Sequence, residues 1–345
     1  MSRTRLTFFY RRKNPLFFSI ENVFENIAAK LKEISAVTLD VAEVKMPFHS
    51  GVKTIVKNMR FLGSRQTRIN HITGDIHYGI LACKNRNINI LTIHDCVSIQ
   101  FYRKYDPRYW LIKWLWYTLP VRKADMVTVI SEKTREELLD ITFADPEKIR
   151  VISNFVDPDF TEKVPGSDWV RPRILFIGTT PNKNLDRLIE AVSSMPVVLD
   201  IVGELSSIQI ATLKKGSISY ENASKLSKGE LIRKYEQCDL LAFPSTYEGF
   251  GLPIVEAQAV GRPVLTSGIS PMKEVAGEGA CLIDPFDVDS IRRGLRRIIE
   301  EPEFREGLVI SGKKNVSRFS LDTIAGSYAS LYMELINKKF NFQSN

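Results

Sequence analysis

The residues with the clearest chemical potential lie in one short stretch of the second half of the chain. The segment Phe243-Pro-Ser-Thr-Tyr-Glu-Gly-Phe-Gly-Leu-Pro-Ile-Val-Glu-Ala places Glu248 and Glu256 eight residues apart, on either side of a glycine-containing loop. Pro253 suits the start of a helix, where a missing N–H costs nothing. Free N–H groups and the dipole at a helix start bind anions such as a diphosphate. Ionised carboxylates accept hydrogen bonds from sugar hydroxyls, so the stretch suits a phosphorylated sugar.

Two interpretations of the acids compete. In the structural one, Glu248 is a solvated loop residue and Glu256 complements the dipole of a helix start. The pattern between them favours the functional one. Tyr247-Glu-Gly-Phe-Gly-Leu-Pro, followed after two residues by Glu-Ala, resembles the signature of retaining glycosyltransferases of the GT-B fold, most closely family 4. The resemblance extends over about residues 171–319 and is weaker in the first half of the chain.

The resemblance implies a role for each residue of this loop. Glu256 would hydrogen-bond the ribose of a donor nucleotide, and Glu248 would orient the hydroxyls of the transferred sugar as a catalytic residue. The backbone between the two acids would hold the sugar and the diphosphate of the donor. The donor-binding residues of this backbone are Gly249, Phe250, Gly251 and Leu252.

A second loop, within Phe176-Ile-Gly-Thr-Thr-Pro-Asn-Lys-Asn-Leu, carries a cation. We expect a strand to end at Gly178 and a helix to begin after Asn182, so that Lys183 enters the same site from a strand end of the same sheet. An exposed lysine at a helix start opposes the helix dipole, which favours a bound anion beside Lys183. The resemblance implies that Lys183, as the lysine of this loop, stabilises the departing diphosphate as a catalytic residue.

The second loop also departs from the family pattern. The family usually offers an arginine and a lysine here, and Lys183 matches the lysine. Gly178, Thr179 and Thr180 are the donor-binding candidates of this loop. Thr179 and Thr180, like Asn182, stand where arginine is common. Hydroxyls and helix amides would then substitute, or an arginine such as Arg12 or Arg187 would arrive from elsewhere. The resemblance also implies that Gly203, at the end of a later strand, lets the nucleotide base approach the backbone closely.

In the first half, Ile90-Leu-Thr-Ile-His-Asp-Cys places His94 and Asp95 at the end of a predicted buried strand. A lone histidine is more often structural, but a position at a carboxyl strand end beside an aspartate favours function. The resemblance implies that His94 faces the transferred sugar as a catalytic residue. Asp95 would orient the imidazole or meet the acceptor. Arg12 is an acceptor-side or diphosphate candidate, with a solvated basic loop as an equal alternative.

His71, Asp75 and His77, near an earlier strand end, are further acceptor-side candidates. No metal-ligand spacing accompanies them.

Short apolar runs alternate with longer helical patterns in both halves, which indicates two doubly wound parallel sheets. Ligands of such sheets bind at the carboxyl ends of the strands. The predicted fold class is α/β, with two Rossmann-like domains facing across a cleft (GT-B). The predicted parts are an acceptor-binding domain at 1–156, a linker at 157–170, a donor-binding domain at 171–320, and a helix at about 321–340 that packs back on the first domain.

The predicted strands of these sheets are 6–10, 37–41, 69–73, 88–93, 126–130, 149–152, 174–177, 197–202, 217–220, 240–243, 264–266 and 280–283. The predicted helices are 20–34, 79–83, 107–120, 132–139, 184–193, 228–237, 253–260, 288–300, 303–317 and 321–337.

Composition narrows the function classes. Hydrophobic residues make up 44% of the 345 residues, which suits globular domains, and the net charge of +8 favours anionic partners. The basic residues are spread out, so we expect no nucleic acid partner. Four separated cysteines indicate reduced, buried thiols and a cytoplasmic location. We expect no signal peptide, and no uncharged run approaches the roughly 18 residues of a membrane helix.

Tyrosines and tryptophans mixed with arginine and lysine over 102–116 suit an interfacial helix on an anionic membrane, with a buried aromatic helix as the alternative.

These patterns lead to one hypothesis. The resemblance implies a retaining, metal-independent glycosyltransferase that moves a hexose-type sugar from a nucleotide-diphosphate sugar to a glycan or lipid-linked acceptor, in surface polysaccharide or glycoconjugate synthesis. It implies no cofactor, and the chain carries no Asp-x-Asp motif to hold a metal on the diphosphate. The alternatives are a sugar-nucleotide-binding protein without transfer activity and an epimerase on the same architecture.

Overall fold

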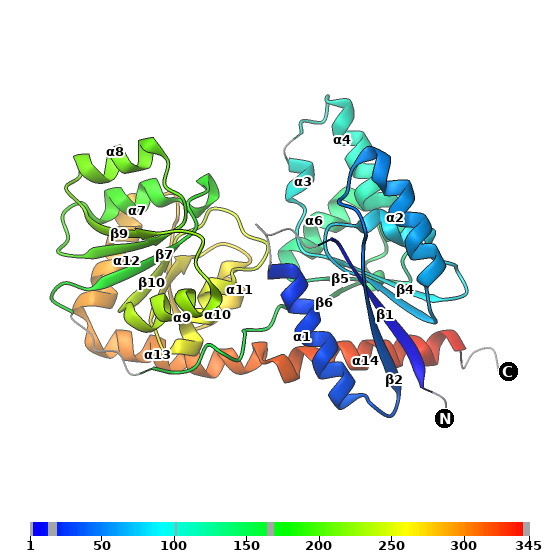
Figure 1. Cartoon of the computed structure of the whole chain (residues 1–345). Helices are drawn as coiled ribbons and strands as arrows, with labels where there is room; N and C mark the ends of the chain where they lie inside the picture. Colours follow the sequence, from blue (N-terminus) through cyan, green and yellow to red (C-terminus); the bar gives the residue numbers. More distant parts are fainter. Residues whose placement is uncertain (1–2, 13–18, 101, 164–168, 341–345) are drawn as a thin grey trace. The chain divides into compact units, whose positions relative to one another are not determined.

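The computed structural model describes residues 3–12, 19–100, 102–163 and 169–340 (Figure 1). The chain forms two compact units: one runs to Phe155 and resumes at Leu321, and the other is Val156–Ser320. The division falls one residue before the predicted end of the first domain. Of the predicted linker, residues 164–168 lie outside the described part of the chain.

The first unit is built on a parallel sheet in the order β2-β1-β3-β4-β5-β6. Its strands are β1 (Thr4–Tyr10), β2 (Leu39–Lys45), β3 (Ile69–Ile72), β4 (Ile88–Ile93), β5 (Met126–Val129) and β6 (Ile149–Val151). Its helices are α1 (Ser19–Ile34), α2 (Val52–Arg65), η1 (His77–Ala82), α3 (Val97–Gln100), α4 (Pro107–Ile112), η2 (Lys113–Thr118), α5 (Leu119–Lys123), α6 (Glu132–Thr142), η3 (Pro146–Lys148) and α14 (Leu321–Phe340). Every residue of β3, β4 and β5 is buried, as in a parallel sheet covered on both faces.

Helix α14 belongs to the first unit although it follows the second unit in the sequence (Figure 1). Its apolar residues recur at helical spacing, so one face packs into the core formed by β1, β3 and α1. Tyr332 on this face donates to or accepts from His71 Nδ1 at 2.7 Å. At the surface, Glu334 pairs with Arg150 at 2.6 Å. The predicted C-terminal helix is therefore present and contacts the first unit.

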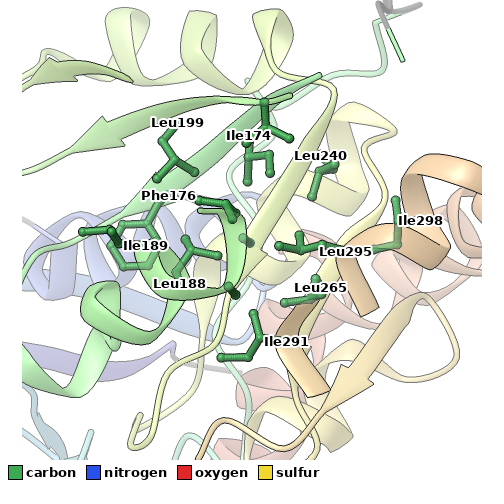
Figure 2. Close-up of a cluster of buried hydrophobic side chains, with 14 of the residues drawn as sticks. Ile174, Phe176, Leu188, Ile189, Leu199, Leu240, Leu265, Ile291, Leu295 and Ile298 are labelled. Atoms are coloured by element: carbon green, nitrogen blue, oxygen red, sulfur yellow. The ribbon is translucent and has the colours of Figure 1, made fainter. Parts of the chain in front are cut away.

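The second unit is built on a parallel sheet in the order β12-β11-β10-β7-β8-β9. Its strands are β7 (Arg173–Ile177), β8 (Val198–Val202), β9 (Ser219–Ala223), β10 (Leu240–Phe243), β11 (Val264–Ser267) and β12 (Ala280–Ile283). Its helices are η4 (Pro181–Lys183), α7 (Leu185–Val192), α8 (Ser207–Lys215), α9 (Lys228–Gln237), α10 (Leu252–Val260), α11 (Met272–Ala276), α12 (Val288–Glu300), α13 (Pro302–Val316) and η5 (Ser317–Phe319). Figure 2 shows the core on one side of this sheet, where Phe176 and Leu240 of the strands pack near Leu188 of α7 and Leu295 of α12.

Each strand order reverses direction once, and this reversal positions the candidate sites. In the second sheet β7 and β10 are neighbours, so the loops after these two strands leave the sheet side by side. In the first sheet the reversal lies between the neighbouring strands β1 and β3. Such reversals open a crevice at the carboxyl ends of the strands, where ligands of open α/β sheets bind.

Helices α2, α3, α8 and α11 lie where the sequence analysis predicts none. Helix α2 starts after Gly51, which provides no side-chain cap, and α2 has no acid in its first turn. Helix α8 has a capping box of Ser206 and Gln209, a signal that the sequence analysis overlooked. The single helix predicted at 107–120 is divided into α4, the π-helical η2 and α5.

Candidate functional site

The loops after β7 and β10 are fastened together by amide hydrogen bonds. Asn182 Nδ2 donates to the carbonyl of Tyr247 at 3.0 Å, and the Thr246 amide donates to the carbonyl of Asn182 at 2.8 Å. Asn184 Nδ2 donates to the carbonyl of Pro244 at 3.0 Å from a left-handed backbone conformation. Because three bonds join the loops, the side chains that they carry are held in one place.

Lys183 and Glu248 form an ion pair across these two loops. The distance from Lys183 Nζ to Glu248 Oε1 is 2.7 Å, and both side chains are mostly buried. Lys183 Nζ also lies 4.7 Å from the ring centre of Phe243. Gly178 makes room for this lysine: its φ is +89°, and a Cβ there would lie 2.9 Å from Lys183 Cε. The two predicted catalytic residues of the second unit are therefore in direct contact.

The start of α10 presents backbone amides next to Glu248. Gly251 is the N-cap with φ +109°, a conformation that favours glycine. Phe250 is buried and packs edge-on against Phe319 at 5.6 Å, which fixes the turn. Within the described part of the chain, the amides of Gly249–Leu252 donate to no protein acceptor. These N–H groups at a helix start can bind an anion.

Glu256 lies one turn into α10 and accepts a hydrogen bond of 2.5 Å from the Tyr235 hydroxyl. The protein around its carboxyl removes water and raises the pKa of Glu256 to about 7, and Asp157 adds to this rise. The Tyr235 hydrogen bond and the charge of Lys183 act in the opposite direction. Near neutral pH the Glu256 carboxyl is therefore present in both its protonated and its ionised form, and either form can hydrogen-bond a ligand hydroxyl.

The threonines that replace the family arginine are occupied by protein contacts. Thr179 Oγ1 donates to the Glu204 carbonyl at 2.6 Å, and Thr180 Oγ1 donates to Asn182 Oδ1 at 2.7 Å. Gly203, with φ +145°, lets Thr179 approach, since a Cβ there would lie 2.8 Å from Thr179 Cγ2. The three residues thus form the wall of the turn after β7. The hydroxyls of Thr179 and Thr180 both donate to protein acceptors, and only their lone pairs remain available to a ligand.

Arg187 and Arg12 have contacts away from Lys183. Arg187 Nη1 donates to Asn184 Oδ1 at 2.9 Å and its guanidinium lies 5.7 Å from the ring centre of Phe286, so it supports the turn that carries Lys183. Arg12, in the first unit, is exposed and donates to the Pro47 carbonyl at 3.0 Å.

The first unit has a cavity of about 300 Å³ at the carboxyl ends of β1, β3 and β4. The predicted residues His94 and Asp95 both line this cavity. Arg11, the neighbour of the predicted Arg12, lines it as well. The remaining lining residues are Gly74, Asp75, His77, Val97, Ser98 and Tyr117.

Asp95 is not the hydrogen-bond partner of His94. Asp95 Oδ1 accepts from the Val97 amide at 3.0 Å, which starts α3. His94 Nε2 is buried without a hydrogen bond to any described residue. Burial lowers the pKa of His94 to about 3, assisted by His77 and Arg11, so the imidazole is neutral. The option that Asp95 orients the imidazole is therefore not seen, whereas its acceptor-side option is compatible with its place in the cavity.

His71 is a core residue. Its Nδ1 contacts the Tyr332 hydroxyl and its Nε2 contacts Thr92 Oγ1, both at 2.7 Å. Burial lowers the pKa of His71 to about 3. Both ring nitrogens are occupied inside the core, so His71 has no nitrogen left for a ligand.

Among the described residues there is neither a metal-binding cluster nor a membrane-spanning helix. No group of three or more His, Cys, Asp or Glu side chains there is arranged to hold a metal ion. None of the helices there combines the length and the apolar character that crossing a membrane requires.

Two family models match the chain, one on each unit. Residues 159–315 match the model for glycosyl transferases group 1, and residues 47–160 match the model for glycosyltransferase family 4. The chain belongs to the glycosyltransferases of group 1 and family 4. The loop with Glu248 and Glu256 and the turn with Lys183 both lie inside the group 1 match.

Curated relatives align with a part of the chain. The MMP alpha-(1->4)-mannosyltransferase of Mycolicibacterium hassiacum is 30% identical over 227 residues, which is 61% of this chain and 54% of the relative. The serotype-specific mannosyltransferase WbdA of Escherichia coli is 26% identical over 222 residues, 57% of this chain and 27% of the relative. The chain thus spans about half or less of the length of these relatives.

Solved structures show the same fold over nearly the whole chain. Sucrose-phosphate synthase from Thermosynechococcus elongatus has a TM-score of 0.76 at 16% identity, covering 97% of this chain and 100% of that one. HepE of Anabaena, in complex with UDP and glucose, has a TM-score of 0.76 at 16% identity, covering 96% and 100%. The α/β fold of this chain, with two six-stranded parallel sheets, is therefore the GT-B fold that the sequence predicts.

Proposed function

We propose that this chain is a glycosyltransferase that moves a hexose from a nucleotide-diphosphate sugar to a hydroxyl of a glycan or lipid-linked acceptor. The observation that carries the proposal is the Lys183–Glu248 ion pair beside the free amides at the start of α10. These groups meet where the order of the second sheet reverses, the place at which such sheets bind phosphorylated ligands. Family membership supports the same reaction.

The departing diphosphate would be stabilised electrostatically. When the bond between the anomeric carbon and the diphosphate oxygen breaks, negative charge develops on that oxygen, and Lys183 with the amides of 250–252 would neutralise it. In the structure, Glu248 neutralises Lys183. A diphosphate would compete with Glu248 for the lysine, and the freed carboxylate could then accept hydrogen bonds from the sugar hydroxyls.

The acceptor hydroxyl would attack the face that the leaving group vacates and pass its proton to the departing diphosphate oxygen, so the configuration of the anomeric carbon is retained. No enzymic nucleophile is assigned. We propose that the reaction needs no metal, because Lys183 and the amides supply the charge that a divalent ion would otherwise provide. Transfer at full rate in excess chelator is the expected result, and a rate restored only by added Mg²⁺ or Mn²⁺ would contradict it.

The sugar and the setting are inferred from relatives. Mannosyltransferases and a structure holding UDP and glucose are among them, so a mannose or glucose donor is the first choice. WaaG, described as a glycosyltransferase involved in lipopolysaccharide biosynthesis, shares the fold with a TM-score of 0.70. We propose a role in polysaccharide or glycoconjugate synthesis, in the cytoplasm and in peripheral contact with an anionic membrane.

A nucleotide-sugar-binding protein without transfer activity is the second candidate. The absence of the family arginine favours it, since Thr179 and Thr180 direct their hydroxyl protons to protein acceptors. Slow hydrolysis of a bound donor would distinguish an enzyme from a binding protein.

The test is a thermal-shift panel of UDP-, GDP- and ADP-sugars, followed by measurement of nucleoside diphosphate release. One nucleotide series should raise the melting temperature, because a ligand that binds only the folded state stabilises it. Replacing Glu256 with alanine should abolish the shift, while replacing Glu248 with alanine should reduce turnover more than binding. Wild-type behaviour of both variants would refute the site.

A further inference from the structure

The proposed function assigns no role to the hydroxyl of Tyr235, which lies in the second unit. Tyr235 is on α9, and its side chain is fully buried. A buried tyrosine hydroxyl needs a hydrogen-bond partner, and this one donates to Glu256 Oε2 at 2.5 Å. Burial and the nearby Glu256 carboxylate raise the pKa of Tyr235 well above its ordinary value, so the hydroxyl keeps its proton and is the donor.

This contact occupies one of the two carboxylate oxygens of Glu256. Within the described part of the chain, no group donates to the other oxygen, Oε1. Oε1 is also not among the buried atoms that lack a partner, and the Glu256 side chain as a whole is partly exposed. A ligand can therefore reach Oε1 while the protein holds Oε2. Because turning the carboxylate would break the bond to Tyr235, that bond also fixes the direction of Oε1.

The protein also fixes the two helices that carry Tyr235 and Glu256. Arg262 is 1% exposed, and its Nε donates to the Tyr235 carbonyl at 3.0 Å near the end of α9. Its backbone amide donates to the Ala257 carbonyl at 2.8 Å near the end of α10. Phe160 packs edge-on against the Tyr235 ring, with the ring centres 5.3 Å apart. The packing of α9 and α10 therefore sets the hydrogen bond between Tyr235 and Glu256.

Tyr235 is also the main group that favours the ionised form of Glu256. Burial raises the pKa of Glu256, and the Tyr235 hydrogen bond is the strongest effect in the opposite direction. The charges of Asp157 and Lys183 act more weakly, the first raising this pKa and the second lowering it. Both charges have partners of their own: Lys228 contacts Asp157 at 2.6 Å, and Glu248 contacts Lys183 at 2.7 Å. Loss of the Tyr235 hydroxyl would therefore leave Glu256 mostly protonated at pH 7.

We propose that Tyr235 is a positioning residue of the donor site: by holding Glu256 Oε2 it leaves Oε1, in an ionised carboxylate, to accept from the ribose hydroxyls of the nucleotide. The inference rests on the proposed function, because that function supplies the nucleotide. An ionised carboxylate binds a hydroxyl roughly twice as strongly as a neutral acceptor does. Tyr235→Phe would keep the ring that packs on Phe160 but would leave Oε2 without its donor. The hydroxyl thus serves the ribose contact, and the ring serves the core.

The first test compares a ribonucleotide with a nucleotide that lacks both ribose hydroxyls. Calorimetry of UDP, GDP and ADP with the wild type identifies the base, and the 2′,3′-dideoxy form of that nucleotide gives the ribose preference. The wild type should bind the ribonucleotide at least about tenfold more tightly. Tyr235→Phe should lower this preference to about threefold and bind the dideoxynucleotide as the wild type does. A tyrosine that only supports the fold would weaken both nucleotides alike, so an unchanged preference overturns the proposal.

The pH dependence of the ribose preference is a second measurement that packing alone would not alter. Protonation of Glu256 weakens the ribose contact, so the wild-type preference should decline as pH falls through about 7. The phosphates titrate alike in both nucleotides, and their effect cancels in the ratio of the two affinities. In Tyr235→Phe the decline should begin at a higher pH, because the hydrogen bond that lowers the pKa of Glu256 is lost. The same pH profile in both proteins would overturn the proposal.

The Glu256→Gln background shows whether Tyr235 acts through the carboxylate. Glutamine does not ionise, so this variant should have a smaller ribose preference that is independent of pH, and adding Tyr235→Phe to it should change the preference little. A full effect of Tyr235→Phe in that background would overturn the proposal.

Two results of the same titrations separate this inference from the proposed function. If the wild type binds none of the three diphosphates, the donor site itself is refuted, and the inference falls with it. If the wild type binds one of them but does not distinguish it from its dideoxy form, the diphosphate site stands, and the role of Tyr235 is overturned.

Discussion

At the scale of single residues, the donor-site proposal depends on three ionisable side chains with different environments. Lys183 and Glu248 neutralise each other at 2.7 Å, whereas Glu256 lies against Tyr235 and has a pKa raised to about 7. A ligand that carries both phosphate and hydroxyls offers a better partner to each of them. The residue scale therefore makes two predictions.

Lys183→Met should reduce turnover roughly 10²–10³-fold, because one preorganised donor to the leaving group is lost. Methionine keeps much of the length that covers Phe243, so the fold should persist. Nucleoside diphosphate release measures the effect. Lys215→Met, on the exposed end of α8, is the control and should leave turnover unchanged. Equal turnover in both variants would contradict the role of Lys183.

Glu256→Gln should stabilise the chain above pH 7. A carboxyl whose folded pKa is about 7 has an unfolded pKa near 4.5, so the wild type loses stability as pH rises between these values. Glutamine still accepts from Tyr235 and does not ionise. Denaturant unfolding at pH 4 and pH 8 should show no gain at the lower pH and a gain of up to about 3 kcal/mol at the higher. A gain at both pH values would assign the effect to packing.

At the scale of elements, strained turns rather than helices position the site. Gly178, Asn184 and Gly251 all have positive φ and lie on the two loops that carry Lys183 and Glu248. Positive φ is rare for residues with a Cβ, so these turns require the residues that they have.

Gly178→Ala should destabilise the chain by roughly 1–2 kcal/mol and lower turnover, because its Cβ would both strain the backbone and displace Lys183. Gly229→Ala is the matched control. Gly229 lies in α9 with open space around it, so alanine there should stabilise the helix by about 0.5–1 kcal/mol. Thermal unfolding and product release check both variants, and unaltered stability in Gly178→Ala would refute the strain argument.

At the scale of the whole molecule, one surface of the first unit combines exposed apolar side chains with cationic side chains. Trp110, Leu111 and Phe143 are 48%, 58% and 83% exposed, and Lys113 lies over the rings of both Trp110 and Phe143. Nearby, Trp114 is 42% exposed and carries Arg122 over its ring. Such a combination suits the headgroup region of an anionic bilayer.

We expect the chain to sediment with phosphatidylglycerol vesicles and to remain in solution with phosphatidylcholine vesicles. The double variant Trp110→Ala with Phe143→Ala should reduce this binding several-fold, since the buried apolar area is lost. Ile208→Ala, an exposed apolar residue of the second unit, should bind like the wild type. Equal sedimentation with both lipids would refute a role for charge, and wild-type binding by the double variant would refute this surface.

The sequence by itself determined the two sheets and located most residues of the proposed donor site. Local apolar runs located the strands of the described residues, and for β3, β4 and β5 the reason is burial on both faces of a parallel sheet, which leaves continuous apolar segments. The Glu248–Glu256 loop is a contiguous motif. Tertiary structure decided what depends on residues far apart. The tertiary fold pairs Lys183 with Glu248. Asp95 accepts a hydrogen bond from the Val97 amide and makes none with His94. Arg11, not Arg12, lines the cavity of the first unit. The tertiary fold also joins His77 to Trp116, a contact over 39 residues that no local pattern encodes, because it exists only once η1 and η2 fold against each other.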